Sequence, residues 1–312
     1  MGATPGSLLG RCTFPAPGTP VVCAVSGGAD SLALLVLACA AGLSATAVHV
    51  DHGLRAGSDA EADVVAHAAR RVGASFRAER VELEPGPNLE ARARAVRRAV
   101  LGPDAATGHT MDDQAETVLV NLLRGAGLDG LAGMAPGPRH PILGLRRAET
   151  RALCAALGLA VVEDPTNADP RFVRNRVRHE LLPLCSAVAG RDVVPVLARQ
   201  AGVLAAESAL LDGLAGALDP ADARSLADAP AALGRRAARR WLRAGAEHPP
   251  DLAAVERVLA VARGEARATD VAPATRVRRS GGRLSRRALS PADAPVSAPA
   301  GVRPGSAPTP VR

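Results

Sequence analysis

The amino-acid sequence predicts an α/β protein in which a doubly wound, mostly parallel sheet is followed by a smaller, mainly helical domain. Short apolar runs alternate with helical stretches from residue 20 to residue 124, and glycine-rich or polar turns separate them. Such alternation is typical of a parallel sheet with helices on both faces. A length of 312 residues is enough for two domains, each with its own core.

Each element of the expected sheet has a local reason. The run PVVCAV at residues 20–25 is continuous, apolar and rich in β-branched residues, which is typical of a buried parallel strand. Asn88 is the expected N-cap of the helix after the third strand. The expected strands cover residues 20–25, 45–50, 75–83 and 104–109. The expected helices cover residues 30–41, 59–72, 88–101 and 111–124.

The second half of the chain is expected to contain fewer strands. Residues 125–141 are rich in glycine and proline and predict a loop, and residues 146–158 predict an amphipathic helix. A short strand at Val161 is expected to lead through a turn into a basic helix. Residues 275–288 predict a basic hairpin that turns at the sequence SGG. The expected divisions are a first domain (1–190), a linking helix (191–217), a small basic domain (218–290) and a disordered tail rich in proline and alanine (291–312).

Positive charge is concentrated in the C-terminal part of the chain. The net charge is +7, all 38 basic residues are arginine, and lysine is absent. Residues 1–190 contain 19 Arg and 19 Asp plus Glu, whereas residues 191–312 contain 19 Arg and 12 Asp plus Glu. This excess predicts a polyanionic partner for the C-terminal part. High arginine use in a GC-rich genome is the alternative, and it explains the absence of lysine better than the local excess.

Composition argues against several classes of protein. The five cysteines are scattered and form no CxxC pair, which argues against a zinc ribbon, an iron–sulfur site and a disulfide framework. No apolar run approaches the length of a membrane span, and the first twenty residues lack the apolar core of a secretory signal. We therefore expect a cytoplasmic protein with free thiols and no membrane partner.

The turn after the first strand has the composition of an anion-binding loop. The sequence Ser26-Gly27-Gly28-Ala29-Asp30-Ser31 leads from a strand into a helix, so it directs unpaired backbone N–H groups and a positive helix end to one point. It lacks the lysine of a Walker loop. A Mg²⁺ ion that bridges the Asp30 carboxylate and phosphate oxygens would remove the repulsion between them. A plain tight turn capped by Asp30 is the alternative.

A group of ionisable residues follows the fourth expected strand. His109 precedes a helix whose first turns carry Asp112, Asp113 and Glu116, at spacings that place the carboxylates on adjoining faces. Ligands of open α/β sheets bind at the carboxyl ends of the strands, so this group predicts a pocket for a cationic amine. Carboxylates near a helix N-terminus also serve as caps or as a solvated face, which is the alternative.

Four blocks of sequence, in order, resemble the tRNA(Ile)-lysidine synthase family of PP-loop ATP pyrophosphatases, whose fold is adenine nucleotide alpha hydrolase-like. The loop SGGADS is followed by HVDHGLR (49–55), NLEARAR (88–94), a long block at 107–134 and another at 163–183. The resemblance covers residues 21–184 and fades beyond them. It implies that residues 1–190 form the catalytic domain and that residues 218–290 form a tRNA-binding domain.

The resemblance implies an ATP-dependent ligation. In that family, O2 of the wobble cytosine of an isoleucine tRNA with a CAU anticodon attacks the α-phosphate of ATP, and pyrophosphate leaves. The side-chain amine of free lysine then attacks C2 of the adenylated cytidine, AMP departs, and lysidine is formed. The implied cofactors and partners are ATP, Mg²⁺, lysine and this tRNA, and a homodimer is left open. Two alternatives remain: a PP-loop tRNA cytidine 2-thiolase and a non-catalytic tRNA-binding paralogue.

The residues and the resemblance together assign roles. The catalytic set is Asp30, which is also the metal ligand, His109, Asp113 and Glu116. The ATP-binding set is Ser26, Gly27, Gly28, Ala29, Asp30, Ser31, His49, Asp51, His52 and Arg55. The substrate-binding set, for lysine and tRNA phosphates, is Asp112, Asp113, Glu116, Arg94, Arg124, Arg174, Arg176 and Arg178. The chain departs from the family pattern at Arg98, near which an aromatic residue is expected, and at His140-Pro141, where Arg-Pro is expected, so no role is assigned there.

Overall fold

The chain folds into two compact units, Met1–Ser208 and Ala209–Arg312. The computed structural model describes residues 3–51, 58–81, 89–163, 169–243, 250–271 and 275–288. Helix α10 (Val194–Gly216) spans the border between the units, near the predicted linking helix, and the predicted domain limits stay a prediction. By length and composition alone α10 is also apolar enough to cross a membrane, a test that helices of soluble proteins pass as well. The expectation of no membrane partner therefore also stays a prediction.

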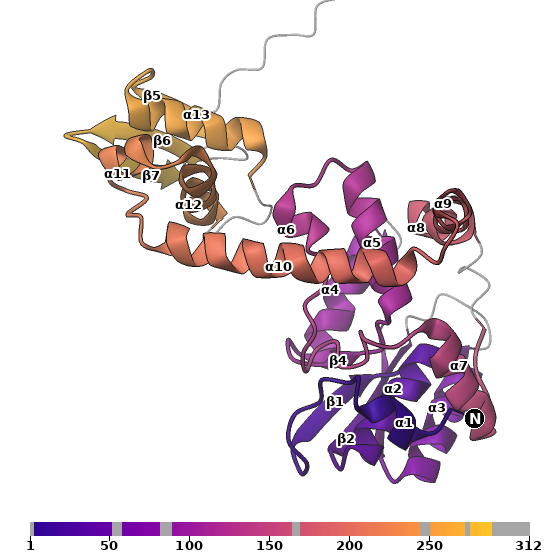
Figure 1. Ribbon diagram of the computed structural model, residues 1–312. Coiled ribbons are helices and arrows are strands. Elements are labelled where there is room, and N and C mark those ends of the chain that lie inside the picture. Colours follow the sequence, from indigo (N-terminus) through magenta and orange to yellow (C-terminus); the bar gives the residue numbers. More distant parts are fainter. Residues whose placement is uncertain are drawn as a thin grey trace, which may run out of the picture. The chain divides into compact units, whose positions relative to one another are not determined.

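The first unit contains the predicted parallel sheet (Figure 1). Its strands are β1 (Pro20–Ala24), β2 (Ser44–Asp51), β3 (Ser75–Arg80) and β4 (Ala106–Thr107). They lie in the order β3-β2-β1-β4, and each pairing is parallel. β4 pairs with β1 through Ala106 and Thr107. Because the chain passes from β3 back to the far side of β1, the carboxyl ends of β1 and β4 border the crevice where such sheets bind ligands.

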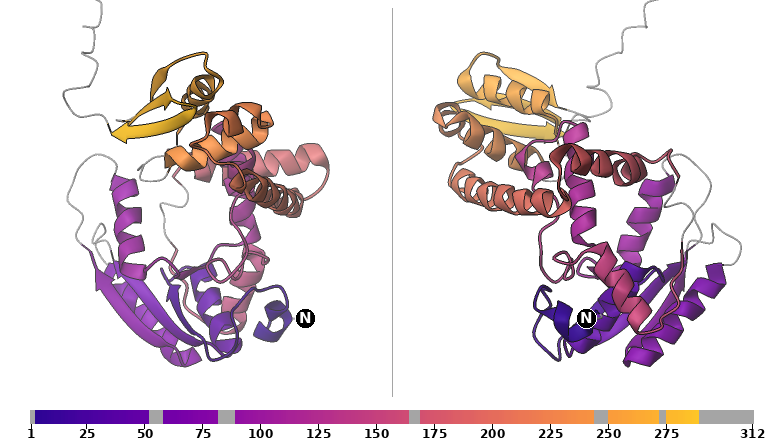
Figure 2. Two further views of the ribbon diagram at one scale, coloured as in Figure 1. Left: turned by 90° about the vertical axis from the view of Figure 1, so that its left-hand side faces the viewer. Right: turned by 45° about the vertical axis from the view of Figure 1, so that its right-hand side comes forward.

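Helices cover both faces of the sheet, as the prediction of a doubly wound fold requires. The helices of this part of the chain are α1 (Pro5–Leu9), α2 (Ala29–Ala40), α3 (Ser58–Val72), α4 (Leu89–Leu101), α5 (Met111–Leu123), α6 (Leu128–Leu131) and α7 (Arg147–Ala156). Among them α1 and α7 pack on α2, and α6 packs on α5. The helices α2 and α3 pack against each other and against β1, β2 and β3 (Figure 2). The connection from β3 to β4 runs in the opposite direction across the sheet, so a right-handed crossover places α4 on the other face.

The helix α2 lies at the centre of the core. Its leucines 32, 34, 35 and 37 are each 0% exposed, because the sheet covers one side of the helix and α7 another. A helix that is apolar all round is buried all round. Burial of each leucine stabilises the fold by about 1.5–3 kcal/mol. The packing of α2 therefore holds the loop that precedes it in a fixed position.

A continuous helical stretch follows α7 and packs against α5. It consists of α8 (Val173–Arg176), a π-helical turn (Val177–Leu181) and α9 (Leu182–Ala189). Val177 and Leu182 pack against Ala115 and Leu119 of α5. These contacts bring the arginines of the predicted basic helix beside the acidic residues of α5. A π-helical turn of this kind is frequent at functional sites.

The second unit consists of helices and a small antiparallel sheet. Its elements are α11 (Ala223–Asp228), α12 (Ala231–Arg243), α13 (Leu252–Arg263), β5 (Ala268–Val271), β6 (Thr275–Ser280) and β7 (Arg283–Ala288). The predicted hairpin is confirmed, since β6 and β7 pair antiparallel, and β5 adds a strand that was not predicted. Val258 of α13 packs with Leu226, Val277 and Leu284 in the core of this unit.

Two local predictions are wrong. The strand expected at Val161 is absent, because this segment pairs with no strand and instead donates one backbone hydrogen bond, from Val162 to the carbonyl of Gly27 at 3.0 Å. The loop expected at 125–141 contains the short helix α6. The expected N-cap Asn88 and the expected disordered tail lie outside the described residues.

Candidate active site

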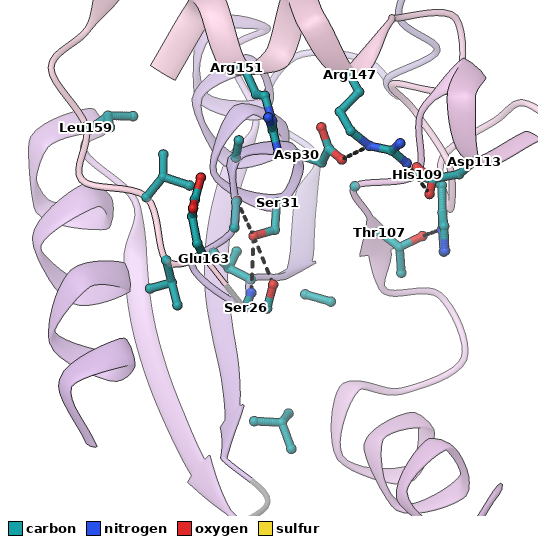
Figure 3. Close-up of a pocket in the computed structure, with 18 of the residues that line it drawn as sticks. Ser26, Asp30, Ser31, Thr107, His109, Asp113, Arg147, Arg151, Leu159 and Glu163 are labelled. Carbon is teal, nitrogen blue, oxygen red and sulfur yellow. Dashed lines mark hydrogen bonds and ion pairs between the residues drawn. The ribbon is translucent and has the colours of Figure 1, made fainter. Parts of the chain in front are cut away.

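The loop between β1 and α2 is closed by its own serines. Ser31 Oγ donates to the carbonyl of Gly28 at 2.8 Å and accepts from the N–H of Ser26 at 3.2 Å, and the two serine hydroxyls lie 3.4 Å apart (Figure 3). Gly28 is the N-cap of α2, so the first N–H groups of that helix lack intrahelical partners at this point. This geometry is that expected of an anion-binding loop.

Two glycines allow the loop to pack closely against its neighbours. Gly27 has a φ of +88°, and a Cβ there would lie 2.8 Å from Cγ2 of Val162. Gly108 follows β4, and a Cβ there would lie 2.7 Å from the carbonyl oxygen of Asp30 and 2.9 Å from the N of Ser31. Both positions therefore require glycine. The contact of Gly108 holds the end of β4 against the first turn of α2.

The carboxylate of Asp30 is bonded to side chains of α7. Its Oδ1 accepts from the hydroxyl of Thr150, and its Oδ2 lies 3.4 Å from Nε of Arg147. Burial raises the pKa of Asp30, the bond from Thr150 lowers it, and the charge of Asp113 raises it again. The net pKa lies above the ordinary value for aspartate, so Asp30 carries its charge at some cost in free energy.

The carboxylates of Asp113 and Glu116 are surrounded by guanidinium groups. Arg147 lies 2.9 Å from Asp113 Oδ1 and 3.1 Å from Glu116 Oε1. Arg174 lies 3.3 Å from Asp113 Oδ1 and 2.9 Å from Glu116 Oε2, and Arg178 lies 3.6 Å from Asp113 Oδ1 and 2.7 Å from Glu116 Oε1. The Glu116 side chain is 0% exposed. The predicted amine pocket thus contains arginine side chains of the chain itself.

The charges in this group stabilise one another. Burial raises the pKa of Asp113. The charge of Arg147, the N–H and hydroxyl of Thr110 and the charge of Arg174 together lower it by more, so the net pKa is below the ordinary value. Burial likewise lowers the pKa of Arg147, but the charges of Asp113 and Glu116 outweigh burial and raise it. Both groups therefore remain ionised near neutral pH.

Asp112 belongs to a separate ion pair. Its Oδ2 accepts from Nε of Arg146 at 3.0 Å and from the backbone N–H of Arg147 at 2.8 Å. Its Oδ1 accepts from Nη2 of Arg146 at 3.1 Å. Asp112 therefore ties the start of α7 to α5. Its predicted role in substrate binding stays a prediction.

Thr107, His109 and His140 form a polar cluster at the end of β4. The Thr107 hydroxyl donates to the carbonyl of Arg139 at 3.0 Å and lies 2.7 Å from Nδ1 of His109 and 2.9 Å from Nδ1 of His140. Burial lowers the pKa of His140 to about 4, and the charges of His109 and Arg139 add to the effect. His140, to which the sequence assigned no role, is therefore a neutral neighbour of His109.

The loop, Asp113, Thr107 and His109 border one cavity of about 1280 Å³. Ligand pockets usually enclose about 300–1,000 Å³, so this cavity has room for more than one small ligand. The polar residues that line it include Ser26, Asp30, Ser31, Thr107, His109, Asp113, Arg147, Arg151 and Glu163 (Figure 3). Arg178 lines it as well. The structure thus brings together the predicted loop and three of the predicted catalytic residues, with Glu116 buried directly behind them.

The ATP-binding residues predicted at the end of β2 and after it are not found among the described residues that line the cavity. His49 is 3% exposed, its Nδ1 lies 3.0 Å from the carbonyl of Val25, and it is not among the described residues that line the cavity. Asp51 is the last residue of β2. His52 and Arg55 lie outside the described residues. The roles of these four residues in ATP binding stay predictions.

The predicted tRNA-binding arginines fall into two groups. Arg174 and Arg178 bind the carboxylates of α5, whereas Arg176 forms an exposed pair with Glu180 at 2.9 Å. Arg124 is exposed at the end of α5. Arg94 and Arg98 lie in α4; the side chain of Arg94 is outside the described part of the chain, and Arg98 is exposed.

Sequence reasoning missed the residues that α7 contributes. Arg147, Thr150 and Arg151 all border the site, and none was predicted there. A signal was present, because Arg146 and Arg147 stand at the N-terminus of the predicted helix. Cations are unfavourable at that end of a helix dipole unless carboxylates compensate them. Paired arginines at a helix start therefore indicate nearby acidic partners.

Comparison with known proteins defines the class first. Residues 9–185 match the family model described as a PP-loop domain. The U34-tRNA thiolase NcsA from Methanococcus maripaludis is similar in structure, with a TM-score of 0.51 at 19% identity, over 64% of this chain and 76% of that chain. At that identity the likeness shows a shared fold alone. The chain is thus a PP-loop protein with the fold that the sequence predicts.

Sequence relatives then define the family. The tRNA(Ile)-lysidine synthase of Nocardia farcinica is 46% identical, over 81% of this chain and 85% of that protein. The tRNA(Ile)-lysidine synthase of Rhodococcus erythropolis is 44% identical, over 73% of this chain and 75% of that protein. The chain belongs to the tRNA(Ile)-lysidine synthase family.

Proposed function

We propose that this chain ligates lysine to C2 of the wobble cytidine of a CAU-anticodon isoleucine tRNA, with ATP as the activating co-substrate. The products are lysidine-containing tRNA, AMP and pyrophosphate. One observation carries the proposal: an anion-binding loop and the carboxylate of Asp113, which shares its arginine partners with the buried Glu116, border a single cavity in a chain of this family. The cytosine must be adenylated by ATP and its C2 must then be attacked by the lysine amine, so the sites for ATP and for the amine must be neighbours.

The loop at residues 26–31 suits the pyrophosphate half of ATP. Backbone N–H groups at the start of α2 and the Ser26 hydroxyl supply donors without a lysine, while the Ser31 hydroxyl closes the loop by donating to the carbonyl of Gly28. When cytosine O2 attacks the α-phosphate, charge builds on the leaving pyrophosphate, and these fixed donors stabilise it. The bond between the α- and β-phosphates breaks as the bond from O2 to the α-phosphate forms.

The site fits a Mg²⁺ ion that would be held by Asp30 and by ATP together. Within the described residues no group of three or more His, Cys, Asp or Glu is arranged to hold a metal ion, and Asp30 is the carboxylate that the loop itself presents to the cavity. Mg²⁺ is commonly held by one or two carboxylates, substrate phosphates and water. When bound there, the ion would offset negative charge on the phosphates. Asp30 would then exchange its contact with Arg147 for the metal.

Asp113, Glu116 and His109 are proposed to bind the lysine amine and to accept its proton. An ammonium ion is no nucleophile, so the amine must lose a proton before it attacks C2. His109 lines the cavity beside Asp113, which supports a role in proton transfer. Asp112, paired with Arg146, is proposed to position α5 and α7 around this pocket.

The arginine-rich C-terminal part is proposed to bind tRNA phosphates. Both strands of the hairpin, β6 and β7, contain arginines, and the side chains of Arg278 and Arg287 are exposed. Charge of this kind supports sequence-independent phosphate binding that weakens with salt. Arg94, Arg124 and Arg176 are proposed to contribute further contacts. A cytoplasmic location and a homodimer are further proposals. Beyond the shared fold, no observation favours the thiolase alternative.

The test is incorporation of labelled lysine into an isoleucine tRNA transcript in the presence of ATP. A transcript with the wobble cytidine replaced by uridine is the matched control, and pyrophosphate release is measured in parallel. We expect incorporation and pyrophosphate release with the cytidine transcript alone. Pyrophosphate release with no lysine in the tRNA, or no reaction at all, would contradict the proposal.

The roles of the carboxylates have their own test. Asp113→Asn and Glu116→Gln are assayed at saturating lysine, after each variant is shown to be folded. We expect turnover to fall in both. Near-normal turnover in both variants would remove Asp113 and Glu116 from the mechanism while leaving the overall reaction intact.

A further inference from the structure

The guanidinium of Arg147 occupies the space between the phosphate loop and the carboxylates of α5. It contacts Asp30 at 3.4 Å, Asp113 at 2.9 Å and Glu116 at 3.1 Å, and its side chain is 18% exposed (Figure 3). A cation is thus already seated where the proposed function places the lysine amine. Lysine and Arg147 cannot both fill that position.

The charges around Asp113 and Glu116 explain why a lysine ammonium cannot enter the space that Arg147 fills. Asp30, Asp113 and Glu116 supply three negative charges, and Arg147, Arg174 and Arg178 supply three positive charges. A lysine ammonium that entered this set would be an unbalanced cation in a largely desolvated place, which is unfavourable. Lysine therefore needs one guanidinium to leave first.

The geometry indicates that Arg147 is the group that leaves. Arg147 and Arg178 both line the cavity, but Arg174 and Arg178 approach Glu116 from the stretch of α8 and the π-helical turn that packs on α5. Arg147 comes from α7 and also contacts Asp30 of the loop. Its contact with Asp30 is weak at 3.4 Å, and Asp30 already accepts from Thr150. Phosphate oxygens are strong bidentate partners for a guanidinium, and Asp30, which Arg147 contacts, belongs to the loop proposed to bind the phosphates.

We propose that Arg147 fills the amine subsite of the nucleotide-free chain and moves to the phosphates of ATP, so that lysine binds after ATP. This inference rests on the proposed function and adds an order of binding to it. The exchange replaces one buried cation by another, so the carboxylates remain neutralised throughout. It also keeps the amine out until there is a nucleotide to activate the tRNA.

The experiment measures the affinity for lysine by isothermal titration calorimetry, with and without α,β-methylene ATP, which cannot release pyrophosphate. Coupling between ligand sites typically changes affinity by about 5- to 150-fold, so we expect lysine to bind the wild-type chain at least about fivefold more tightly with the analogue. Arg147→Gln should bind lysine equally well with and without it. Arg171→Gln is the matched control and should keep the coupling, because the Arg171 side chain is 85% exposed, pairs with Asp169 and is not among the described residues that line the cavity.

Reciprocity supplies a measurement that needs no variant. Lysine must raise the affinity of the wild-type chain for the analogue by the same factor. Coupling below about fivefold in the wild-type chain, or full coupling in a folded Arg147→Gln variant, overturns the inference. Lysine incorporation into tRNA by the wild-type chain is measured alongside, because incorporation without coupling rejects the binding order alone, whereas absence of incorporation rejects the proposed function.

Discussion

Replacement of Glu116 by glutamine tests whether the buried ion group holds the first unit together. The two carboxylate oxygens accept five hydrogen bonds from Arg147, Arg174 and Arg178. Glutamine keeps the shape but removes the charge and turns an NH₂ group toward guanidinium N–H groups. Three guanidinium groups would then share Asp113 as the nearest carboxylate on α5.

The size of the effect follows from the exposure of the three partners. Removal of one member of a buried ion pair typically costs about 3–5 kcal/mol. Arg147 and Arg178 are 18% and 23% exposed and lose most of their compensation, whereas Arg174 is 41% exposed and is partly solvated by water. We therefore expect the lower end, a loss of about 3 kcal/mol in the free energy of unfolding. For a unit of this size, that loss lowers the Tm by about 6–12 °C.

Thermal and denaturant unfolding of the purified variant measure this loss. Glu180→Gln is the matched control, because Glu180 pairs with Arg176 on the surface and both side chains are more than half exposed. Surface pairs contribute little, so the control should unfold with the wild-type chain. A Tm for Glu116→Gln within about 2 °C of the control would refute the reasoning.

Three further predictions address other parts of the first unit. Gly108→Ala places a methyl group against the backbone of the phosphate loop and should lower ATP-dependent turnover by about 100-fold, whereas Gly202→Ala, in open space on α10, should leave it unchanged; equal turnover in both would contradict the close packing. The pKa of His140 falls from 6.5 to about 4 on folding, so the stability contribution of this neutral ring is lost as the pH falls from 6.5 toward 4. His140→Gln should flatten the dependence of Tm on pH in that window, and an unchanged slope would contradict it. Burial raises the pKa of the Cys23 thiol to about 12, so we expect this thiol to resist a thiol reagent at pH 8 until the chain is unfolded, and prompt labelling of the native chain at Cys23 would contradict it.

The fold was predictable from the sequence because its signals are local. A β-branched apolar run, a glycine turn and a helix start are each read within about ten residues, and the structure has β1, the loop and α2 in that order. The first turn of α5 was predicted on the same grounds. The strand expected at Val161 is absent because Val162 packs against Gly27 and hydrogen-bonds to it, while Val161 is exposed, so the segment joins no sheet.

The partners of the carboxylates were not predictable in the same way. Arg147 is 31 positions from Glu116, and Arg178 is 62 positions away. Contacts of that range depend on how α5, α7 and the stretch after α7 pack together, and local periodicity does not contain this. The acid residues were recognised, but the sequence could not distinguish an open amine pocket from one filled by the chain's own arginines.

The cavity has a consequence for measurements made in alkaline solution. The described residues that line it ionise through aspartate, glutamate, histidine and arginine, and none of them is lysine, tyrosine or cysteine. The ordinary pKa values of carboxyl and imidazole groups lie below about 7, and that of a guanidinium lies above about 12. The lining therefore contains no type of group whose ordinary pKa is close to that of a free lysine side chain, about 10.4. A rate that climbs around that pH would report the substrate's own ionisation.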